Sequence, residues 1–408
     1  MKLSILTAAS AWGGAEIHTV GLAETLKNRG HDVFVVQLGH DIYGRMGWQD
    51  DKRGKLLRLE ISKPLSDLSL WESRRLLGTL SADACIFAKN TSTIGNLAFE
   101  LAARLHFSRY ITIEHMIPDS MPPKRSGRHL GSLVPGLGLW WIRLYLSRFL
   151  RCLPPHRVIC VSDAIRKRLV EEYRFPAAKV TTIYSGIDPL RFQKNDKTRR
   201  QVRSAWGIPE NAFVFGAVGR LSGEKGYDLA IEAFRQLISG LSLPHRPIRL
   251  VLIGEGRLRS TLEKASREAG LEELILFPGF TDRPWEAYSA FDIFIMPSRT
   301  EGLGLALLEA MACSCCPIAM GVGGVVYVLT DPMFGWLVAP GDTAGFLAAM
   351  RAAAESNTDT LVEMGQKARE HVISCFNSRI QYQALAEFIE RESNGLPSRI
   401  AQRSPKGP

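Results

Sequence analysis

Short apolar segments recur along this chain at intervals that a helix would fill, and this alternation constrains the fold most. Parallel strands need long crossover connections, usually helices, and strands covered on both faces are apolar throughout. The pattern occurs once in the first half and again in the second, so it predicts two doubly wound α/β sheets. The predicted strands cover residues 2–8, 32–38, 55–61, 84–89, 109–115, 157–162 and 180–186, then 213–219, 249–256, 274–280, 292–298, 316–321 and 335–341.

We expect two domains, because 408 residues exceed what one core normally organises. The first would cover residues 1–187 and the second 188–376, joined through the charged segment 188–203. A helix over 377–393 can return to the first domain, and the Pro-, Ser- and Arg-rich tail 394–408 is expected to be disordered. Ligands bind beyond the carboxyl ends of such strands, so two facing domains would form a cleft for two substrates.

Charge and cysteine content narrow the choice of partner and compartment. The net charge of +10 favours an anionic partner, which can be nucleic acid, anionic lipid or a phosphorylated substrate. The seven cysteines have no disulfide or metal-site spacing, and we interpret Cys313, Cys315 and Cys316 as small buried side chains of a reduced protein. The N-terminal residues are predicted to form a strand and not a signal peptide, and no apolar run reaches the length of a membrane span. We therefore expect a cytoplasmic protein.

A glycine turn between the strand at 292–298 and a helix-forming run predicts an anion site. The first N–H groups of a helix have no partner within it, and Gly302 and Gly304 leave the backbone open to a phosphate. Glu301 before the helix and Glu309 within it would repel phosphate and suit sugar hydroxyls better. A nucleotide-sugar has both groups. The alternative is that Glu301 caps the helix and Glu309 is solvated.

The loop GRLSGEKG, residues 219–226, places two cations between a strand and a helix. The guanidinium of Arg220 offers a planar fork for phosphate oxygens, and Lys225 offers a point charge. Isolated basic pairs are usually solvated. Flanked by glycines and placed after a strand, this pair is moderately specific for a diphosphate.

The first domain contributes two weaker candidates. Gly14 lies in the turn after the first strand, where backbone N–H groups face the presumed cleft. His115 ends the strand at 109–115 and could donate to a sugar hydroxyl or stabilise charge. The alternatives are a tight turn with no ligand and a structural histidine.

Together these motifs resemble the retaining glycosyltransferases of the family 4 type, in their usual order and over nearly the whole chain. The specific part is the pair Glu301 and Glu309 together with Arg220 and Lys225. The resemblance implies the GT-B fold, two Rossmann-like domains facing each other across a cleft. The matching segments are GGAE (13–16), RGHDV (29–33), EH (114–115), VSDAIRKRL (161–169), IYSGID (183–188), GRLSGEKG (219–226), GEG (254–256), PGF (278–280) and EGLGLALLEAMA (301–312).

The resemblance also implies roles for these residues. Arg220 and Lys225 would bind the donor diphosphate and stabilise the leaving group. Glu301 would hold the donor sugar and Glu309 the ribose, with His115 near the donor sugar. The implied catalytic residues are Arg220, Lys225, Glu301 and His115, and the implied donor-binding residues are Gly14, Arg220, Lys225, Glu301, Gly302, Leu303, Gly304, Leu305 and Glu309.

The implied reaction moves a hexose-type sugar from a UDP- or GDP-sugar to a hydroxyl of a saccharide acceptor, with retention by front-face attack. No nucleophile and base pair of the glycosidase kind is evident. The chain has no Asp-x-Asp pair, so neither metal nor another cofactor is expected. Two departures from the family stand out. GGVVY (323–327) lacks the customary glutamate, which can change the shape of the donor pocket, and Cys313-Ser314 replaces a glycine after the helix.

Residues 116–153 are the least typical segment, with six basic residues against one acidic residue and a net charge of +5. Over 137–153 the arginines gather on one side of a helical wheel and apolar residues on the other. Such a helix suits an anionic membrane surface, which indicates a lipid-linked acceptor at the cytoplasmic face of a bacterial inner membrane, in lipopolysaccharide or cell-surface polysaccharide synthesis. The alternative is packing on the sheet. The candidate acceptor or membrane residues are Lys124, Arg125, Arg128, Trp140, Trp141, Arg143 and Arg148.

Three other classes of protein remain as alternatives. A non-catalytic nucleotide-sugar-binding protein could use the same fold. A nucleotide-sugar epimerase would need further acid and base carboxylates. A nucleic-acid-binding protein would explain the charge, but no reading module is evident, and we expect no nucleic-acid partner.

Overall fold

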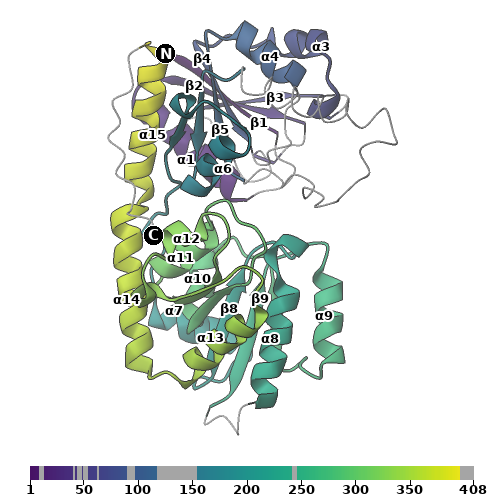
Figure 1. Cartoon of the computed structure of the whole chain (residues 1–408), viewed down its shortest axis with the longest axis vertical. Helices are drawn as coiled ribbons and strands as arrows, with labels where there is room; N and C mark the ends of the chain where they lie inside the picture. The colour runs from purple at the N-terminus through teal and green to yellow at the C-terminus, as the bar shows by residue number, and fades with distance from the viewer. Residues whose placement is uncertain are drawn as a thin grey trace, which may run out of the picture. The chain divides into compact units, whose positions relative to one another are not determined.

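The computed structural model divides the chain into two compact α/β units, and each has a single parallel sheet (Figure 1). Unit 1 comprises Met1–Ser185 and the stretch from Gln381, and unit 2 comprises Gly186–Ile380. This confirms the prediction of two doubly wound sheets. The structure describes residues 1–8, 13–39, 42–43, 48, 54–61, 64–89, 97–116, 154–240 and 246–395.

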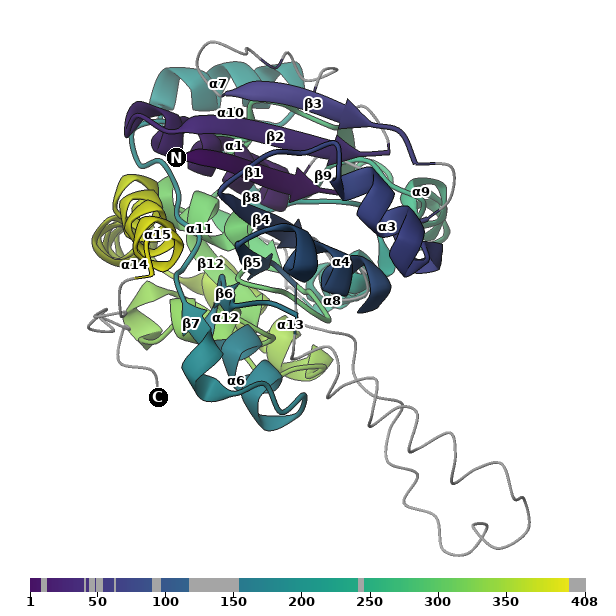
Figure 2. The same cartoon turned by 90° about the horizontal axis from the view of Figure 1, so that it is seen from above.

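The sheet of unit 1 has seven strands in the order β3-β2-β1-β4-β5-β6-β7, so the winding reverses between β1 and β4. Figure 2 shows α3 and α4 together beside this sheet, and their apolar side chains pack on the face that carries Leu6, Val36 and Phe87. The strands are β1 (Lys2–Thr7), β2 (Asp32–Leu38), β3 (Lys55–Leu59), β4 (Ala84–Lys89), β5 (Arg109–Glu114), β6 (Arg157–Cys160) and β7 (Val180–Thr182). The helices are α1 (Gly14–Asn28), α3 (Leu70–Leu77), α4 (Leu97–His106), α6 (Asp163–Glu171) and α15 (Ser378–Ser393).

The sheet of unit 2 has six strands in the order β10-β9-β8-β11-β12-β13, with the reversal between β8 and β11. Its core is built by apolar strand residues such as Phe213, Phe215 and Leu250 with Phe234 of the covering helix α8. The strands are β8 (Phe213–Val218), β9 (Ile248–Ile253), β10 (Ile275–Gly279), β11 (Ile293–Met296), β12 (Cys316–Met320) and β13 (Trp336–Val338). The helices are α7 (Asp196–Ala205), α8 (Tyr227–Gly240), α9 (Arg259–Glu268), α10 (Pro284–Ala290), α11 (Leu305–Ala312), α12 (Val325–Val328), α13 (Thr343–Glu355) and α14 (Thr358–Cys375).

The prediction of a linker over 188–203 was wrong for its second half, which forms most of α7. Arg203 is 2% exposed, and its Nη2 donates to Asp292 Oδ2 at 2.8 Å. Arg199 donates to the other oxygen of Asp292 at 2.6 Å. The sequence showed a run of charge, which is usually solvated. Asp292, which lies 89 residues beyond Arg203, pairs with two of these arginines and makes the helix part of unit 2.

The C-terminal helix α15 is bound to unit 1 by ion pairs. Glu390 accepts hydrogen bonds from Nε and Nη2 of Arg29 at 2.7 and 2.6 Å and lies 2.8 Å from the ring of His31. Arg157 contacts the carboxylate of Glu392 at 2.9 Å. Unit 1 is therefore completed by a segment from the far end of the chain.

The prediction that Cys313, Cys315 and Cys316 are small buried side chains is confirmed. Cys313 and Cys315 are fully buried and Cys316 is 1% exposed, and all three are free thiols. They fill space between α11 and β12, where a larger side chain would not fit a close-packed interior.

Replacing Asp292 by Asn should destabilise unit 2 by about 3 kcal/mol, because the change leaves the buried Arg203 guanidinium without its counter-charge. Denaturant unfolding followed by tryptophan fluorescence measures the change. Glu232→Gln, which breaks an exposed pair with Arg235, is the matched control and should have little effect. Equal effects of the two variants would contradict the role given to Asp292.

Candidate functional site

The loops after β8 and β11 lie side by side where the strand order of unit 2 reverses. β8 pairs with β11, while the chain continues outward to β9 on one side and to β12 on the other. At such a reversal the loops diverge and leave a crevice at the carboxyl ends of the strands, which is where doubly wound sheets bind ligands. Lys225 comes from the first of these loops and Glu301 from the second.

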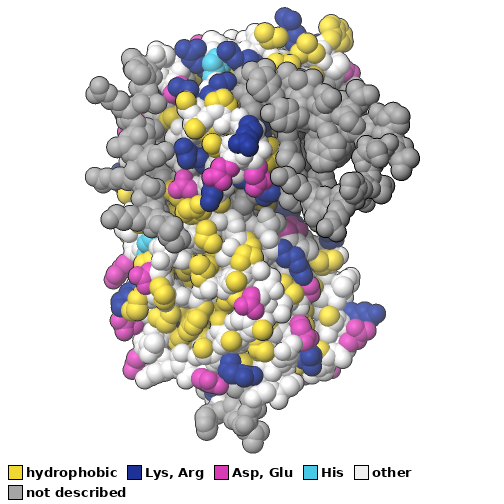
Figure 3. All heavy atoms as spheres, in the orientation of Figure 1, with side chains coloured by type: hydrophobic (Ala, Val, Ile, Leu, Met, Phe, Trp, Pro, Cys, Tyr) yellow, Lys and Arg dark blue, Asp and Glu magenta, His cyan; other side chains and the backbone are white. Residues whose placement is uncertain are grey.

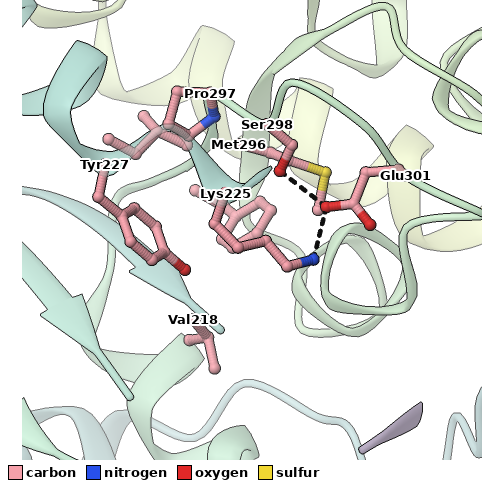
Figure 4. Close-up of a pocket in the computed structure, with 9 residues that line it drawn as sticks. Val218, Lys225, Tyr227, Met296, Pro297, Ser298 and Glu301 are labelled. Carbon is pink, nitrogen blue, oxygen red and sulfur yellow. Dashed lines mark hydrogen bonds and ion pairs between the residues drawn. The ribbon is translucent and has the colours of Figure 1, made fainter. Parts of the chain in front are cut away.

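The two loops bring a cation and a carboxylate into direct contact. Lys225 Nζ donates to Glu301 Oε1 at 2.7 Å, and the hydroxyl of Ser298 donates to the same oxygen at 2.7 Å (Figure 4). Glu301 is only 5% exposed, whereas the Lys225 side chain is 25% exposed. The carboxylate is therefore fixed from two sides, and the ammonium group remains accessible to an anion.

Glu301 is not the helix cap that the alternative interpretation requires. Helix α11 starts at Leu305 with Gly304 at its N-cap, and no side chain accepts a hydrogen bond from its first N–H groups. Gly304 has a φ of 88°, a conformation that other residues adopt only at a cost. The turn thus leaves the helix N-terminus open for another partner, while the Glu301 carboxylate is held by Lys225 and Ser298.

Arg299, which the sequence did not single out, holds the two loops together. Its Nη1 donates to the carbonyl of Gly223 at 2.8 Å, and its two terminal nitrogens bind the carboxylate of Asp228 at 2.8 and 2.6 Å. Its backbone N–H donates to the carbonyl of Glu224 at 2.8 Å. These contacts fix the turn that presents Lys225.

Gly226 allows this close approach. A Cβ added there would lie 2.0 Å from the carbonyl oxygen of Pro297, and the residue has a φ of 67°. Any other residue would push the two loops apart and separate the Lys225 ammonium from the Glu301 carboxylate. The glycine at the end of GRLSGEKG is therefore a requirement of the loop contact.

A small pocket lies at this contact. The space inside it is about 10 Å³, room for about one water molecule and far below the roughly 300–1,000 Å³ of typical ligand sites, so it can hold only a single small group of a ligand. Figure 4 shows Lys225 and Glu301 facing each other at its polar side. The pocket is lined by Val218, Lys225, Tyr227, Phe294, Ile295, Met296, Pro297, Ser298 and Glu301.

Arg220 lies at the start of the same loop but is not part of the pocket. Its side chain is 61% exposed, and its guanidinium is 3.9 Å from the carboxylate of Glu224. This weak pairing leaves its hydrogen-bond donors largely available.

Glu309 accepts a hydrogen bond from Tyr288, a second residue that the sequence did not single out. The hydroxyl of Tyr288 donates to Glu309 Oε2 at 2.8 Å. Burial raises the pKa of Glu309 to about 7, while this hydrogen bond and the charge of Arg191 lower it. Glu309 is therefore not the freely solvated helical residue of the alternative interpretation.

The candidates of the first domain lie in unit 1. Gly14 is the first residue of α1, and His115 directly follows β5. Nε2 of His115 is 3.2 Å from Nδ1 of His18, and burial lowers the pKa of His115 to about 4, so its ring is neutral near pH 7. The seven candidates Lys124, Arg125, Arg128, Trp140, Trp141, Arg143 and Arg148 lie outside the described residues.

The two departures from the family pattern are visible in unit 2. The N–H of Gly324 donates to the carbonyl of Gly302 at 3.0 Å, so the loop GGVVY contacts the turn before α11. Ser314 has a φ of 55°, the left-handed conformation that glycine usually provides after a helix.

The geometry defines a class of protein. A doubly wound sheet with a cation, a helix N-terminus and hydroxyl-accepting carboxylates at its reversal point is suited to a phosphorylated sugar compound. Comparisons with known proteins give the same class. A model described as "Glycosyl transferases group 1" matches residues 198–371, and one described as "Glycosyltransferase Family 4" matches residues 12–191.

The chain belongs to the glycosyltransferases of the family 4 type and has the GT-B fold. It is 27% identical to the uncharacterized glycosyltransferase MJ1607 of Methanocaldococcus jannaschii over 80% of this chain and 82% of that protein. Other curated relatives, 33% and 28% identical, are covered over only 51% and 57% of their own length.

Solved structures of low sequence identity share the fold. Anabaena HepE in complex with UDP-glucose has a TM-score of 0.76 at 20% identity, with 96% of this chain and 99% of that chain covered. WaaG, a glycosyltransferase involved in lipopolysaccharide biosynthesis, has a TM-score of 0.69 at 17% identity, with 95% and 99% covered.

Replacing Arg299 by Ala should raise the donor KM about tenfold with a smaller change in kcat, because the turn that presents Lys225 loses its anchor. Steady-state kinetics with varied donor measures both constants. Arg235→Ala, which removes an exposed arginine of α8, is the control and should leave KM unchanged. An unchanged KM in the Arg299 variant would show that the loop contact does not position Lys225.

Proposed function

We propose that this glycosyltransferase moves a hexose-type sugar from a UDP- or GDP-sugar to a hydroxyl of a saccharide acceptor, with retention of configuration. The observation that carries the proposal is the contact between Lys225 and Glu301 at the strand reversal of unit 2. It brings a cation that can bind phosphate next to a buried carboxylate that can accept sugar hydroxyls, and this pairing supports the proposal. The family membership supports the same assignment.

The donor diphosphate would bind at the basic loop and at the N-terminus of α11. Lys225 and Arg220 would neutralise its charge, and the free N–H groups that follow Gly304 would donate to its oxygens. As the bond between sugar and phosphate breaks, negative charge develops on the leaving diphosphate. Cations already in place stabilise that charge without further reorganisation.

Glu301 would orient the donor sugar. Its Oε1 accepts from Lys225 and Ser298, and diphosphate binding would draw Lys225 away and free this oxygen for a sugar hydroxyl. The departing phosphate would take the acceptor's proton in a front-face attack, so no enzyme nucleophile is needed. We propose that the reaction proceeds without a metal, which the missing Asp-x-Asp pair supports.

His115 would act as a neutral hydrogen-bond donor near the donor sugar. Its lowered pKa keeps the ring uncharged at neutral pH, so it would supply a directed N–H group rather than a positive charge. Gly14 would allow close approach of the diphosphate or the acceptor to the N-terminus of α1.

We propose that the acceptor is a lipid-linked saccharide at the cytoplasmic face of the inner membrane, in lipopolysaccharide or surface polysaccharide synthesis. The basic sequence of segment 116–153 and the fold shared with WaaG support this. Among the described helices, none is long and apolar enough to cross a bilayer. On the face of unit 2 in Figure 3, acidic and basic side chains are interspersed, unlike the continuous basic track that nucleic acid requires.

A panel of UDP-, GDP- and ADP-sugars tests the donor assignment without added metal. One sugar nucleotide should bind and be hydrolysed slowly, and Glu301→Gln should lower kcat/KM about 100-fold because it weakens contacts that strengthen in the transition state. Binding without hydrolysis or transfer would favour a non-catalytic binding protein. Conversion of the donor into its epimer would favour an epimerase, and no binding at all would contradict the proposal.

Vesicle sedimentation tests the membrane assignment. The protein should bind vesicles that contain phosphatidylglycerol at physiological salt, and replacing Arg143 and Arg148 by Glu should abolish binding because like charges repel. Vesicles of phosphatidylcholine alone are the control. Equal binding to both, or none to either, would contradict an anionic membrane partner.

A further inference from the structure

We propose that Tyr288 is a positioning residue that orients the Glu309 carboxylate toward the ribose hydroxyls of the donor nucleotide. The proposal rests on the proposed function, in which Glu309 contacts the ribose. Tyr288 belongs to α10, and neither the sequence motifs nor the pocket lining includes it.

The hydrogen bond from Tyr288 occupies one oxygen of the Glu309 carboxylate and leaves the other for a ligand. The Tyr288 hydroxyl donates to Oε2 of Glu309 at 2.8 Å. In the described part of the chain, Oε1 of Glu309 has no hydrogen-bond partner. Oε1 can therefore accept a ligand hydroxyl while Oε2 remains fixed.

Aromatic packing holds the Tyr288 ring, so its hydroxyl cannot follow a moving carboxylate. The ring is fully buried and lies 5.8 Å from Phe294, 6.1 Å from Phe291 and 6.3 Å from Phe192, centre to centre. The thiol of Cys315 donates to the Tyr288 carbonyl at 3.0 Å and fixes its backbone. A rigid donor of this kind holds its partner in one geometry before the ligand arrives.

Among the described residues, few charged groups face Glu309 from the elements packed around it. Arg191, whose guanidinium stacks 4.3 Å from the Trp285 ring, attracts the carboxylate, and the thiol of Cys313 lies one turn further along α11. Arg369 on α14 donates instead to the carbonyls of Phe192 and Ala312. The Tyr288 hydroxyl is therefore the main local support for the ionised form.

The pH dependence follows from these contacts. Burial raises the pKa of Glu309 to about 7, and the Tyr288 hydrogen bond opposes this rise by favouring the ionised form. Without the hydroxyl the pKa rises further. More of the carboxyl is then protonated at neutral pH, and a protonated carboxyl accepts ribose hydroxyls less well. The loss of affinity should therefore be largest below pH 7 and fall at high pH to the part that the lost orientation of the carboxylate causes.

The test measures nucleotide affinity by calorimetry from pH 6 to 9. UDP, GDP and ADP are screened with the wild type, and the one that binds is compared with its 2′-deoxy form. Tyr288→Phe should weaken binding about tenfold at pH 7, recover most of the wild-type affinity near pH 9, and lower the preference for ribose, as expected for the loss of a hydrogen bond to a charged group. Glu309→Gln should lose that preference at every pH.

Tyr110→Phe is the matched control. Tyr110 is a fully buried tyrosine of β5 whose hydroxyl has no hydrogen-bond partner among the described residues, so its removal should leave nucleotide affinity unchanged at every pH.

The outcomes separate this proposal from the proposed function. No nucleotide binding by the wild type would overturn both. Binding that Glu309→Gln weakens but Tyr288→Phe leaves unchanged would overturn only the role of Tyr288. A loss in Tyr288→Phe that is equal at all pH values would indicate a structural role and also overturn it. If Tyr288→Phe does not fold, the comparison of the wild type with Glu309→Gln still tests the proposal. The nucleotide affinity of the wild type must rise as the pH passes through 7, and the affinity of Glu309→Gln must not. Equal pH dependence of the two proteins would contradict the proposal.

Discussion

The contact between the loops after β8 and β11 is the constraint on which the candidate site depends. The parallel pairing of the two strands brings the loops together, and the lack of a side chain at Gly226 lets their backbones touch. Arg299 then fixes the turn through Gly223 and Asp228. The contact between Lys225 and Glu301 follows from this backbone arrangement. A site built on such an arrangement is ordered before its ligand binds, which lowers the entropy cost of binding.

Buried charge in this protein is supported by matching partners drawn from distant parts of the chain. Arg203 forms an ion pair with Asp292. In unit 1, the ammonium group of Lys89 contacts the carboxylates of Glu100 and Glu114 at 2.8 and 3.2 Å. Isolated charges in a protein interior cost several kcal/mol, so these partners are needed for folding. Glu309 differs, because its support is a neutral hydroxyl, and its pKa stays near neutrality. Structural charges are thus closely paired, whereas the carboxylate assigned to ligand binding keeps an unbound oxygen.

Much of the fold was predictable from the sequence, because the signals are local. Each predicted strand is present, since an apolar run of six to eight residues between helix-length segments has few other solutions. Among the site residues, Lys225 and Glu301 were found because glycines mark turns between a strand and a helix. Arg299 and Tyr288 were missed because an arginine in a loop and a tyrosine in a helix have no flanking glycine pattern that would indicate a function. Their partners lie 71 and 21 residues away, and only folding shows them.

The sequence by itself determined the two parallel sheets, the loops at their carboxyl ends and the family, because strand periodicity, glycine positions and motif order are properties of the chain. The tertiary structure decided which charged residues are structural and which are open to a ligand. From the sequence, the arginines of 188–203 were interpreted as part of a solvated linker, but the structure pairs two of them with Asp292. Glu301 was equally consistent with a helix cap, but the structure has Gly304 at the N-cap position. The physical reason is that a side chain's ionisation and availability depend on its neighbours in space, which the order of residues does not specify.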